Sequence, residues 1–195
     1  MEIIPLFSTP LIVDSLETNV GGLDREKIYV TNANYKKSDD YRVLERHPKL
    51  KRLILNKFHK IAKDIFCYDN EFKISTSWLT ETKKGERPLL HLHKNSFYSG
   101  VYYYEDYSDN VGGIEFQNPL EQLPSFYLIP TQWNMMNMNT WSLIPQRNKI
   151  IFFPSYLSHR VCEHHDDTPR HSLAFNIIPL GGYGEGDSSY NTGWR

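Results

Sequence analysis

The segment RPLLHLHKNSFYSGVYYYE, residues 87–105, sets two histidines one residue apart in front of a run rich in aromatic side chains. Aromatic and β-branched side chains favour strands. Residues two apart in an extended chain point to the same side, so His91 and His93 share a face. Two imidazoles on one face can hold a divalent metal, but two protein ligands make a weak site, and a third is needed.

The same pattern of short strands and turns continues through most of the sequence after residue 70. Gly, Pro, Asn and Asp residues divide the strand-like segments, which is typical of an antiparallel sandwich or barrel. The segments are FKISTSWLTE, SFYSGVYYYE, IEFQ, NMMNMNTWSLIP, KIIFFPSYLSHRVCEH and RHSLAFNIIP. Before them, apolar residues between His47 and Tyr68 recur at helical spacing. We therefore expect a mainly β fold with N-terminal helical elements.

Length and composition limit the classes of protein that this chain can belong to. A chain of 195 residues suits one domain, with 22 basic and 23 acidic side chains. The balanced charge argues against nucleic acid as a partner, and no apolar run is long enough to cross a membrane. Cys67 and Cys162 lie far apart and suggest no disulfide framework, which favours a cytoplasmic location. The expected layout is extended and helical support in 1–70, a β core in 71–180 and a flexible Gly/Ser-rich tail in 181–195.

Two later segments supply candidates that complete the site. His159, in SYLSHRV, follows the apolar strand KIIFFP and is a natural third ligand. Three protein ligands with open positions are typical of a metal that does chemistry. In RHSLAFN, strand alternation places Arg170, Ser172 and Asn176 on one face. A buried arginine needs an anionic partner, and a guanidinium with a hydroxyl two residues away suits the terminal carboxylate of a small dicarboxylate.

These residues together resemble the Fe(II)- and 2-oxoglutarate-dependent oxygenases, and most closely the branch found in phages and bacteria. The resemblance rests on His-x-His followed by SGVYYY, then GGIEFQNP, His159-Arg160-Val161 and Arg170-x-Ser172, and covers about residues 75–178. It implies a double-stranded β-helix, a jelly-roll fold like that of cupins. It also implies that His91 and His159 bind Fe(II), and that Arg170 with Ser172 binds 2-oxoglutarate as the cosubstrate used with molecular oxygen.

The sequence departs from the family pattern at one ligand. The family has His-x-Asp, and this chain has His93 in place of the aspartate. The usual triad is two His and one carboxylate, but three-His iron sites also support dioxygen chemistry in cupin-type enzymes, so we expect His91, His93 and His159 to be both the metal ligands and the catalytic centre. A shifted pair of His93 and Asn95, or a carboxylate from Glu115, are the alternatives.

Further positions outside the proposed metal site also carry expectations. Tyr102, Tyr103 and Tyr104 alternate across their strand, so at least one faces the cavity; Tyr102 is our candidate for a hydrogen bond to the oxoacid. Asn176 shares the face of Arg170 and could orient a ligand or a metal-bound histidine. His164 and His165 lie in a charged loop and are expected to be solvated.

The expected function is a 2-oxoglutarate-dependent dioxygenase of the hydroxylase type. It would couple decarboxylation of 2-oxoglutarate to succinate with oxidation of a small molecule or a protein side chain. Two alternatives remain from the sequence: a cupin-like Zn(II) hydrolase or isomerase, and a non-catalytic β-sandwich. Arg170-x-Ser172 discriminates between them, because neither alternative needs a dicarboxylate clamp. A homo-oligomer is compatible with the sequence.

Overall fold

The computed structural model describes residues 2–4, 7–18, 23, 26, 28–32, 35–121, 126, 128–191 and 193. Strands dominate this part of the chain, with one α-helix near the N-terminal end, which confirms the mainly β prediction. The strands are β1 (Ile12–Ser15), β2 (Ile28–Asn32), β3 (Tyr35–Ser38), β4 (Phe72–Thr82), β5 (Tyr98–Tyr102), β6 (Ile114–Gln117), β7 (Thr140–Leu143), β8 (Lys149–Pro154), β9 (His159–Val161), β10 (Arg170–Pro179), β11 (Gly182–Tyr183) and β12 (Tyr190–Asn191). The helices are the 3-10 turns η2 (Val43–Glu45) and η3 (Gly186–Ser188) and the α-helix α1 (Pro48–Asp64).

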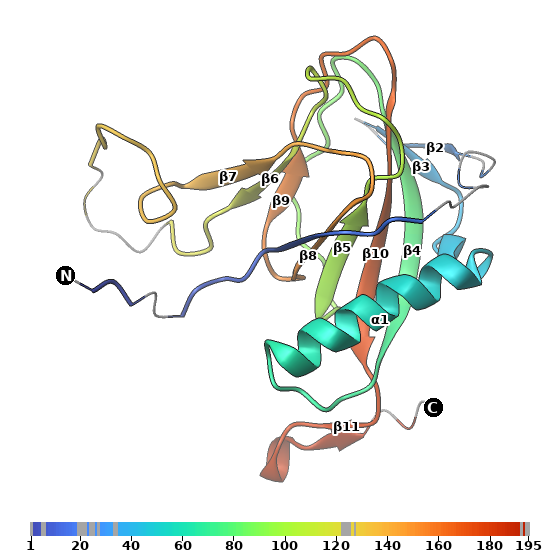
Figure 1. Cartoon of the computed structure of the whole chain (residues 1–195), viewed down its shortest axis with the longest axis vertical. Coiled ribbons are helices and arrows are strands. Elements are labelled where there is room, and N and C mark those ends of the chain that lie inside the picture. The colour runs from blue at the N-terminus through green and yellow to red at the C-terminus, as the bar shows by residue number, and fades with distance from the viewer. Residues whose placement is uncertain are drawn as a thin grey trace.

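The strands form one large sheet, one small sheet and a hairpin. The large sheet has the order β1-β8-β5-β10-β4-β3-β2, and its pairings are antiparallel. The small sheet has the order β7-β6-β9 and extends to one side, while α1 crosses the other face of the large sheet (Figure 1). This arrangement leaves the face of the large sheet opposite α1 to meet the small sheet, which is where the site lies.

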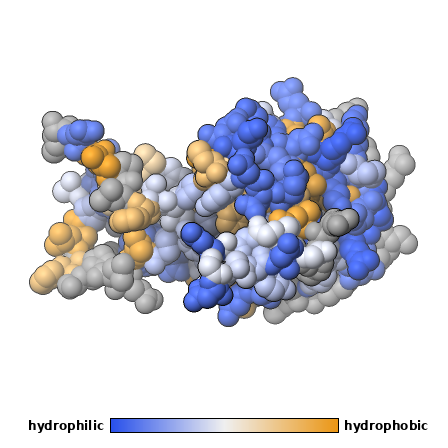
Figure 2. Space-filling view, turned by 90° about the horizontal axis from the view of Figure 1, so that it is seen from below, coloured by the Kyte–Doolittle hydropathy of each residue, from blue (hydrophilic) through white to orange (hydrophobic). Residues whose placement is uncertain are grey.

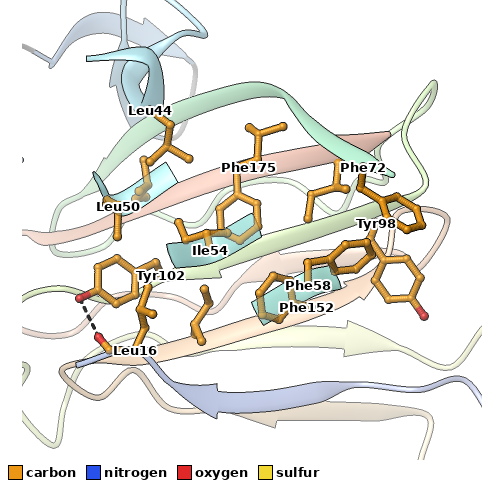
Figure 3. Close-up of a cluster of buried hydrophobic side chains, with 14 of the residues drawn as sticks. Leu16, Leu44, Leu50, Ile54, Phe58, Phe72, Tyr98, Tyr102, Phe152 and Phe175 are labelled. Carbon is orange, nitrogen blue, oxygen red and sulfur yellow. Dashed lines mark hydrogen bonds between the residues drawn. The ribbon is translucent and has the colours of Figure 1, made fainter. Parts of the chain in front are cut away.

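Helix α1 forms because its sequence alternates apolar and charged positions at helical spacing. Its buried residues are Leu50, Ile54, Phe58, Ile61 and Ala62. Pro48 stands in the first turn, where its missing N–H costs nothing. The helix ends before the predicted residue 68, because Cys67 takes a left-handed φ of 58° and the amide of Phe66 bonds back to the carbonyl of Ile61. The buried face packs on aromatic side chains of β4, β5, β8 and β10, as Figure 3 shows for Phe58 beside Phe152.

Strand alternation in β10 divides the core from the site. Leu173, Phe175 and Ile177 lie in the core under α1. The residues between them face the other way, as expected from the sequence. In β4 the register shifts beside Asn176, because one extra residue, Ser75, lies between the positions paired with Asn176 and Ile177. This bulge keeps the apolar ends of both strands on the core side while their polar residues face the site.

Several parts of the structure were not expected from the sequence. Strands β2 and β3 form an antiparallel hairpin that extends the large sheet beyond β4. Within the tail, β11 pairs with β12. Figure 2 shows apolar side chains gathered at the end of the molecule that carries β6 and β7, where Leu128, Ile129, Met135 and Met136 are exposed. Both cysteines are free thiols, and no helix among the described residues is long and apolar enough to cross a membrane.

Candidate active site

Three histidines from two segments of the chain meet between the large and the small sheet. His91 forms an isolated antiparallel bridge with His159, in which the amide of each donates to the carbonyl of the other at 3.0 and 2.8 Å. The amide of His93 donates to the carbonyl of Ser155 at 2.9 Å. The His-x-His pair therefore precedes β5 instead of lying in it, but its backbone pairing keeps both side chains on one side. Their ligand atoms and that of His159 all lie within 4.8 Å of one another.

The hydrogen bonds of the three rings fix which nitrogen atoms face the centre. Nδ1 of His91 lies 2.8 Å from the carbonyl oxygen of Leu89, and Nδ1 of His159 lies 2.9 Å from that of Leu157. A carbonyl can only accept, so in both rings Nδ1 carries the proton. Nδ1 of His93 likewise donates to a side-chain amide oxygen at 2.6 Å. In each neutral ring the lone pair is therefore on Nε2, which is the form that binds a metal.

Burial keeps two of these rings in the neutral form. Burial is the main cause that lowers the pKa of His159 to about 3, and the nearby His91 adds to it. Burial also lowers the pKa of His93. A metal ligand must be deprotonated at its donor atom, so these two rings can bind a cation without first losing a proton near neutral pH. The chemistry of the donor set fits a divalent first-row metal such as Fe(II).

The two alternative ligands suggested by the sequence are engaged elsewhere. Glu115 accepts a hydrogen bond from Nε of Arg160 at 2.7 Å and pairs with the same guanidinium in the small sheet. Asn95 lies in a turn with a left-handed φ of 59° and does not line the cavity that holds the three histidines. Among the described residues, the metal-ligand cluster therefore contains three histidines and no carboxylate.

Asn176 has the orienting position that the sequence suggested. Its side-chain oxygen accepts from Nδ1 of His93 and from the hydroxyl of Ser99, at 2.6 and 2.8 Å. Its amide nitrogen donates to the hydroxyl of Thr76 at 3.0 Å. Neither Ser99 nor Thr76 was expected from the sequence, although both lie on strands whose alternation points them toward Asn176. The network holds the ring of His93 through its Nδ1, the nitrogen opposite the one that faces the centre, as hydrogen-bond partners of metal ligands do.

Arg170 is a buried cation with incomplete hydrogen bonding. Its side chain is only 2% exposed, and its Nη2 donates to the hydroxyl of Tyr103 at 3.1 Å. Burial raises the pKa of Tyr103, so this hydroxyl stays neutral and does not compensate the charge. Nε and Nη1 of Arg170 are buried and have no partner in the described structure. Leaving such donors unpaired is costly, so the position fits an anion bound by charge-assisted hydrogen bonds.

Ser172 and its neighbours complete the polar end of the site. Its hydroxyl lies 2.8 Å from that of Thr80, the residue opposite it on β4. Thr82 is opposite Arg170, and its hydroxyl is buried without a partner. Three hydroxyl-bearing residues, Ser172, Thr80 and Thr82, therefore line the same cavity as Arg170. This donor set matches one carboxylate of a small dicarboxylic acid.

One cavity of about 210 Å³ connects the histidines with Arg170. Typical pockets for drug-sized ligands measure ~300–1,000 Å³, so this cavity suits a small organic acid. Val101, Ile114 and Phe153 are among its apolar lining residues. Its lining residues are Lys37, Tyr41, Trp78, Thr80, Thr82, Pro88, His91, His93, Gly100, Val101, Ile114, Phe153, His159, Val161, Arg170, Ser172 and Ala174.

Two sequence-based interpretations are corrected by the structure. Tyr102 points to the α1 side of the sheet, where its hydroxyl donates to the carbonyl of Leu16 at 3.2 Å (Figure 3). It lies away from the cavity, whereas the hydroxyl of Tyr103 accepts a hydrogen bond from Arg170. His164 was expected to be solvated but is buried: its Nδ1 accepts from the amide of Gly112 at 3.2 Å. Both corrections depend on which strands and loops pack together, which a local pattern does not specify.

Comparison with known proteins places this site in a family. The model of a family described as "Putative 2OG-Fe(II) oxygenase" matches residues 76–176, the range that holds the triad, Arg170 and Asn176. No curated protein matches the chain.

Solved structures of the same fold are found in several bacteria. HygX from Streptomyces hygroscopicus, with nickel, 2-oxoglutarate and hygromycin B bound, is 10% identical with a TM-score of 0.61 and covers 88% of this chain and 83% of its own. A 2OG-Fe(II) oxygenase family oxidoreductase from Burkholderia pseudomallei is 12% identical with a TM-score of 0.57, over 79% and 72% of the two chains. A prolyl-4-hydroxylase from Pseudomonas putida is 14% identical with a TM-score of 0.54, over 81% and 80%.

The structural matches show the shared double-stranded β-helix fold, and the family model covers more than half of the chain. The cofactor and cosubstrate of this family are Fe(II) and 2-oxoglutarate, and the clustered histidines and the unpaired guanidinium fit both. The chain belongs to the 2OG-Fe(II) oxygenase family and is a 2-oxoglutarate-dependent oxidoreductase.

Proposed function

We propose that this oxygenase is a hydroxylase that inserts one oxygen atom into a C–H bond of an organic substrate while 2-oxoglutarate is decarboxylated to succinate. One observation carries the site assignment. The same small cavity holds three convergent Nε2 lone pairs and a buried guanidinium in which two nitrogen atoms, Nε and Nη1, have no hydrogen-bond partner in the described structure. A metal and a dicarboxylate together would satisfy both sets of groups.

In this assignment each residue has a defined task. His91, His93 and His159 would hold Fe(II), which with molecular oxygen and 2-oxoglutarate supplies the oxidation chemistry. Arg170 would bind the far carboxylate of 2-oxoglutarate through its guanidinium, and Ser172 would donate its hydroxyl to the same group. Asn176 would keep the ring of His93 oriented. Val101, Ile114 and Phe153 form apolar walls that limit the access of water.

The composition of the cavity favours oxygenation over hydrolysis. No Asp or Glu side chain lines the cavity in the described part of the chain, so a metal-bound water would have no neighbouring carboxylate as a general base. Hydroxylation needs no protein group to accept a proton from the substrate. A zinc hydrolase would also not need the buried guanidinium of Arg170 as a binding group for a dicarboxylate. We further propose that the whole chain acts as one catalytic domain, since α1 packs on the sheet that carries the site.

The test is to measure succinate formation from 2-oxoglutarate by the protein supplied with Fe(II) and air. We expect slow turnover without substrate, faster turnover when candidate small molecules are added, and a product that has gained one oxygen atom. His159→Ala should abolish turnover, whereas His165→Ala, which changes an exposed histidine outside the cluster, should not. Succinate formation that is unchanged in His159→Ala, or a product without added oxygen, would contradict the proposal.

A further inference from the structure

We propose that Lys37 and Tyr41 bind the carboxylate of the substrate to be oxidised, so that the substrate is a small organic acid. The inference rests on the proposed function and deepens it by naming the substrate class. Both residues line the same cavity as the triad and lie outside the elements that carry the metal and 2-oxoglutarate groups.

Strand pairing places Lys37 on the floor of the cavity. In β3 it lies opposite Thr80 of β4, and Thr80 lies opposite Ser172 of β10. These three residues form a row across the sheet on the face that carries the site. The preceding residue, Lys36, points to the other face and pairs with Glu81 at 3.4 Å. Two adjacent lysines thus have different surroundings, which supplies a matched control.

The ammonium group of Lys37 has a neutral partner. It donates to the hydroxyl of Tyr41 and lies 4.7 Å from the centre of the Tyr41 ring. No carboxylate pairs with it in the described part of the chain, and its side chain is half-buried. A partly desolvated cation without a counter-ion attracts an anion. The phenol hydrogen of Tyr41 adds a second donor. Lys37 and Tyr41 together can therefore donate hydrogen bonds to both oxygens of one carboxylate.

A chain of aromatic contacts leads from this pair to the metal ligands. The rings of Tyr41 and Trp78 are 5.9 Å apart and meet edge to face, and those of Trp78 and His93 are 5.4 Å apart. The backbone of Tyr41 is fixed by the amide of Ser77, which donates to its carbonyl at 2.8 Å. A substrate whose carboxylate lies on Lys37 would extend along Trp78 and present its carbon chain at the histidines.

This site is separate from the one for 2-oxoglutarate. The buried guanidinium of Arg170, whose Nε and Nη1 have no partner in the described structure, already suits one carboxylate. Lys37 lies on β3, two strands away from β10, and neighbouring strands are about 4.8 Å apart. A single lysine also compensates a single negative charge, which suits a monocarboxylate better than a phosphate ester carrying about two charges.

The experiment uses a pair of probes that differ in charge but not in shape, 3-phenylpropanoate and 3-phenylpropanamide. Binding of each to the anaerobic protein with Fe(II) and 2-oxoglutarate is measured by calorimetry. We expect the acid to bind about tenfold more tightly than the amide, as one charge-assisted carboxylate contact allows. Lys37→Met should reduce the preference to less than about twofold, while Lys37→Arg and the control Lys36→Met should keep most of it.

Three results would overturn the inference: equal binding of acid and amide to the unaltered protein, no binding of the acid, or an unchanged preference in Lys37→Met. Loss of 2-oxoglutarate affinity in Lys37→Met as large as in Arg170→Met would assign Lys37 to the cosubstrate clamp and overturn it too. The visible absorption of the Fe(II) and 2-oxoglutarate complex is recorded first in each sample. If this absorption is absent, the proposed function is contradicted. The ratio of the affinities for the acid and the amide tests only the role of Lys37.

Discussion

Replacing Arg170 with Met should remove 2-oxoglutarate binding without weakening the fold. The guanidinium is 2% exposed, and its Nε and Nη1 have no partner in the described structure. Only one hydrogen bond, to Tyr103, would be lost. Methionine fills a similar volume and needs no counter-ion, and exchange of buried charged groups for apolar ones is often neutral or stabilising by ~1–4 kcal/mol. Without ligand, the variant should therefore unfold at the same temperature as the unaltered protein or higher.

The loss of cosubstrate affinity follows from the two unpaired donors. Hydrogen bonds to charged groups contribute ~1.5–3 kcal/mol each, so two give at least about 3 kcal/mol. This corresponds to a dissociation constant raised about 100-fold, since ~1.4 kcal/mol is a factor of ten. At a 2-oxoglutarate concentration of ~100 times the original dissociation constant, ligand-dependent stabilisation should fall from ~2.7 to ~0.4 kcal/mol.

The assay is thermal unfolding with and without 2-oxoglutarate, under anaerobic conditions with Fe(II), together with a spectroscopic titration of the cosubstrate. Arg147→Met is the control, because Arg147 is exposed and pairs with Asp106 far from the cavity lining. A dissociation constant within about threefold of the original would refute the reasoning, as it corresponds to less than ~1 kcal/mol. A strongly destabilised apoprotein would show that the charge of Arg170 is compensated inside the fold.

Three other outcomes follow from particular contacts. Asn176→Leu should weaken metal binding ~10–100-fold by freeing the ring of His93, measured by titration with Co(II); a change below twofold would contradict the orienting role. Gly100→Ala should destabilise by ~1–3 kcal/mol or more, because the added carbon would lie 2.3 Å from Phe175; chemical denaturation would measure this, and unchanged stability would be evidence against such close packing. The pKa of His171 is raised, chiefly by its hydrogen bond to Glu105, so its contribution to stability is complete below about pH 6.5 and is lost as pH rises through the raised pKa. His171→Gln should flatten this part of the curve of stability against pH. If the variant and the unaltered protein gave the same curve, the role assigned to His171 would be contradicted.

Much of the site could be predicted because strand alternation is a local property. The shared face of Arg170, Ser172 and Asn176 follows from the period of two, and the structure confirms it. The shared side of His91 and His93 also holds, although the segment pairs with the chain around His159 and Ser155 instead of belonging to β5.

The rest depends on contacts between distant segments. Alternation alone could not say which face of β5 meets α1, so Tyr102 was chosen where Tyr103 reaches Arg170. The burial of His164 results from its hydrogen bonds with Gly112 and Thr168, and a charged sequence around it gave no sign of them. The β2–β3 hairpin, which brings Lys37 into the cavity, has no strong alternating pattern and was not expected.

The central claim is that three histidines and Arg170 bind Fe(II) and 2-oxoglutarate in one cavity. The most direct measurement is the anaerobic visible absorption spectrum of the purified apoprotein during addition of Fe(II) and then 2-oxoglutarate. We expect a weak metal-to-ligand charge-transfer band that appears only when both are present, and that is absent in His93→Ala. A missing band with tightly bound zinc, or a band that is unchanged in His93→Ala, would contradict the claim.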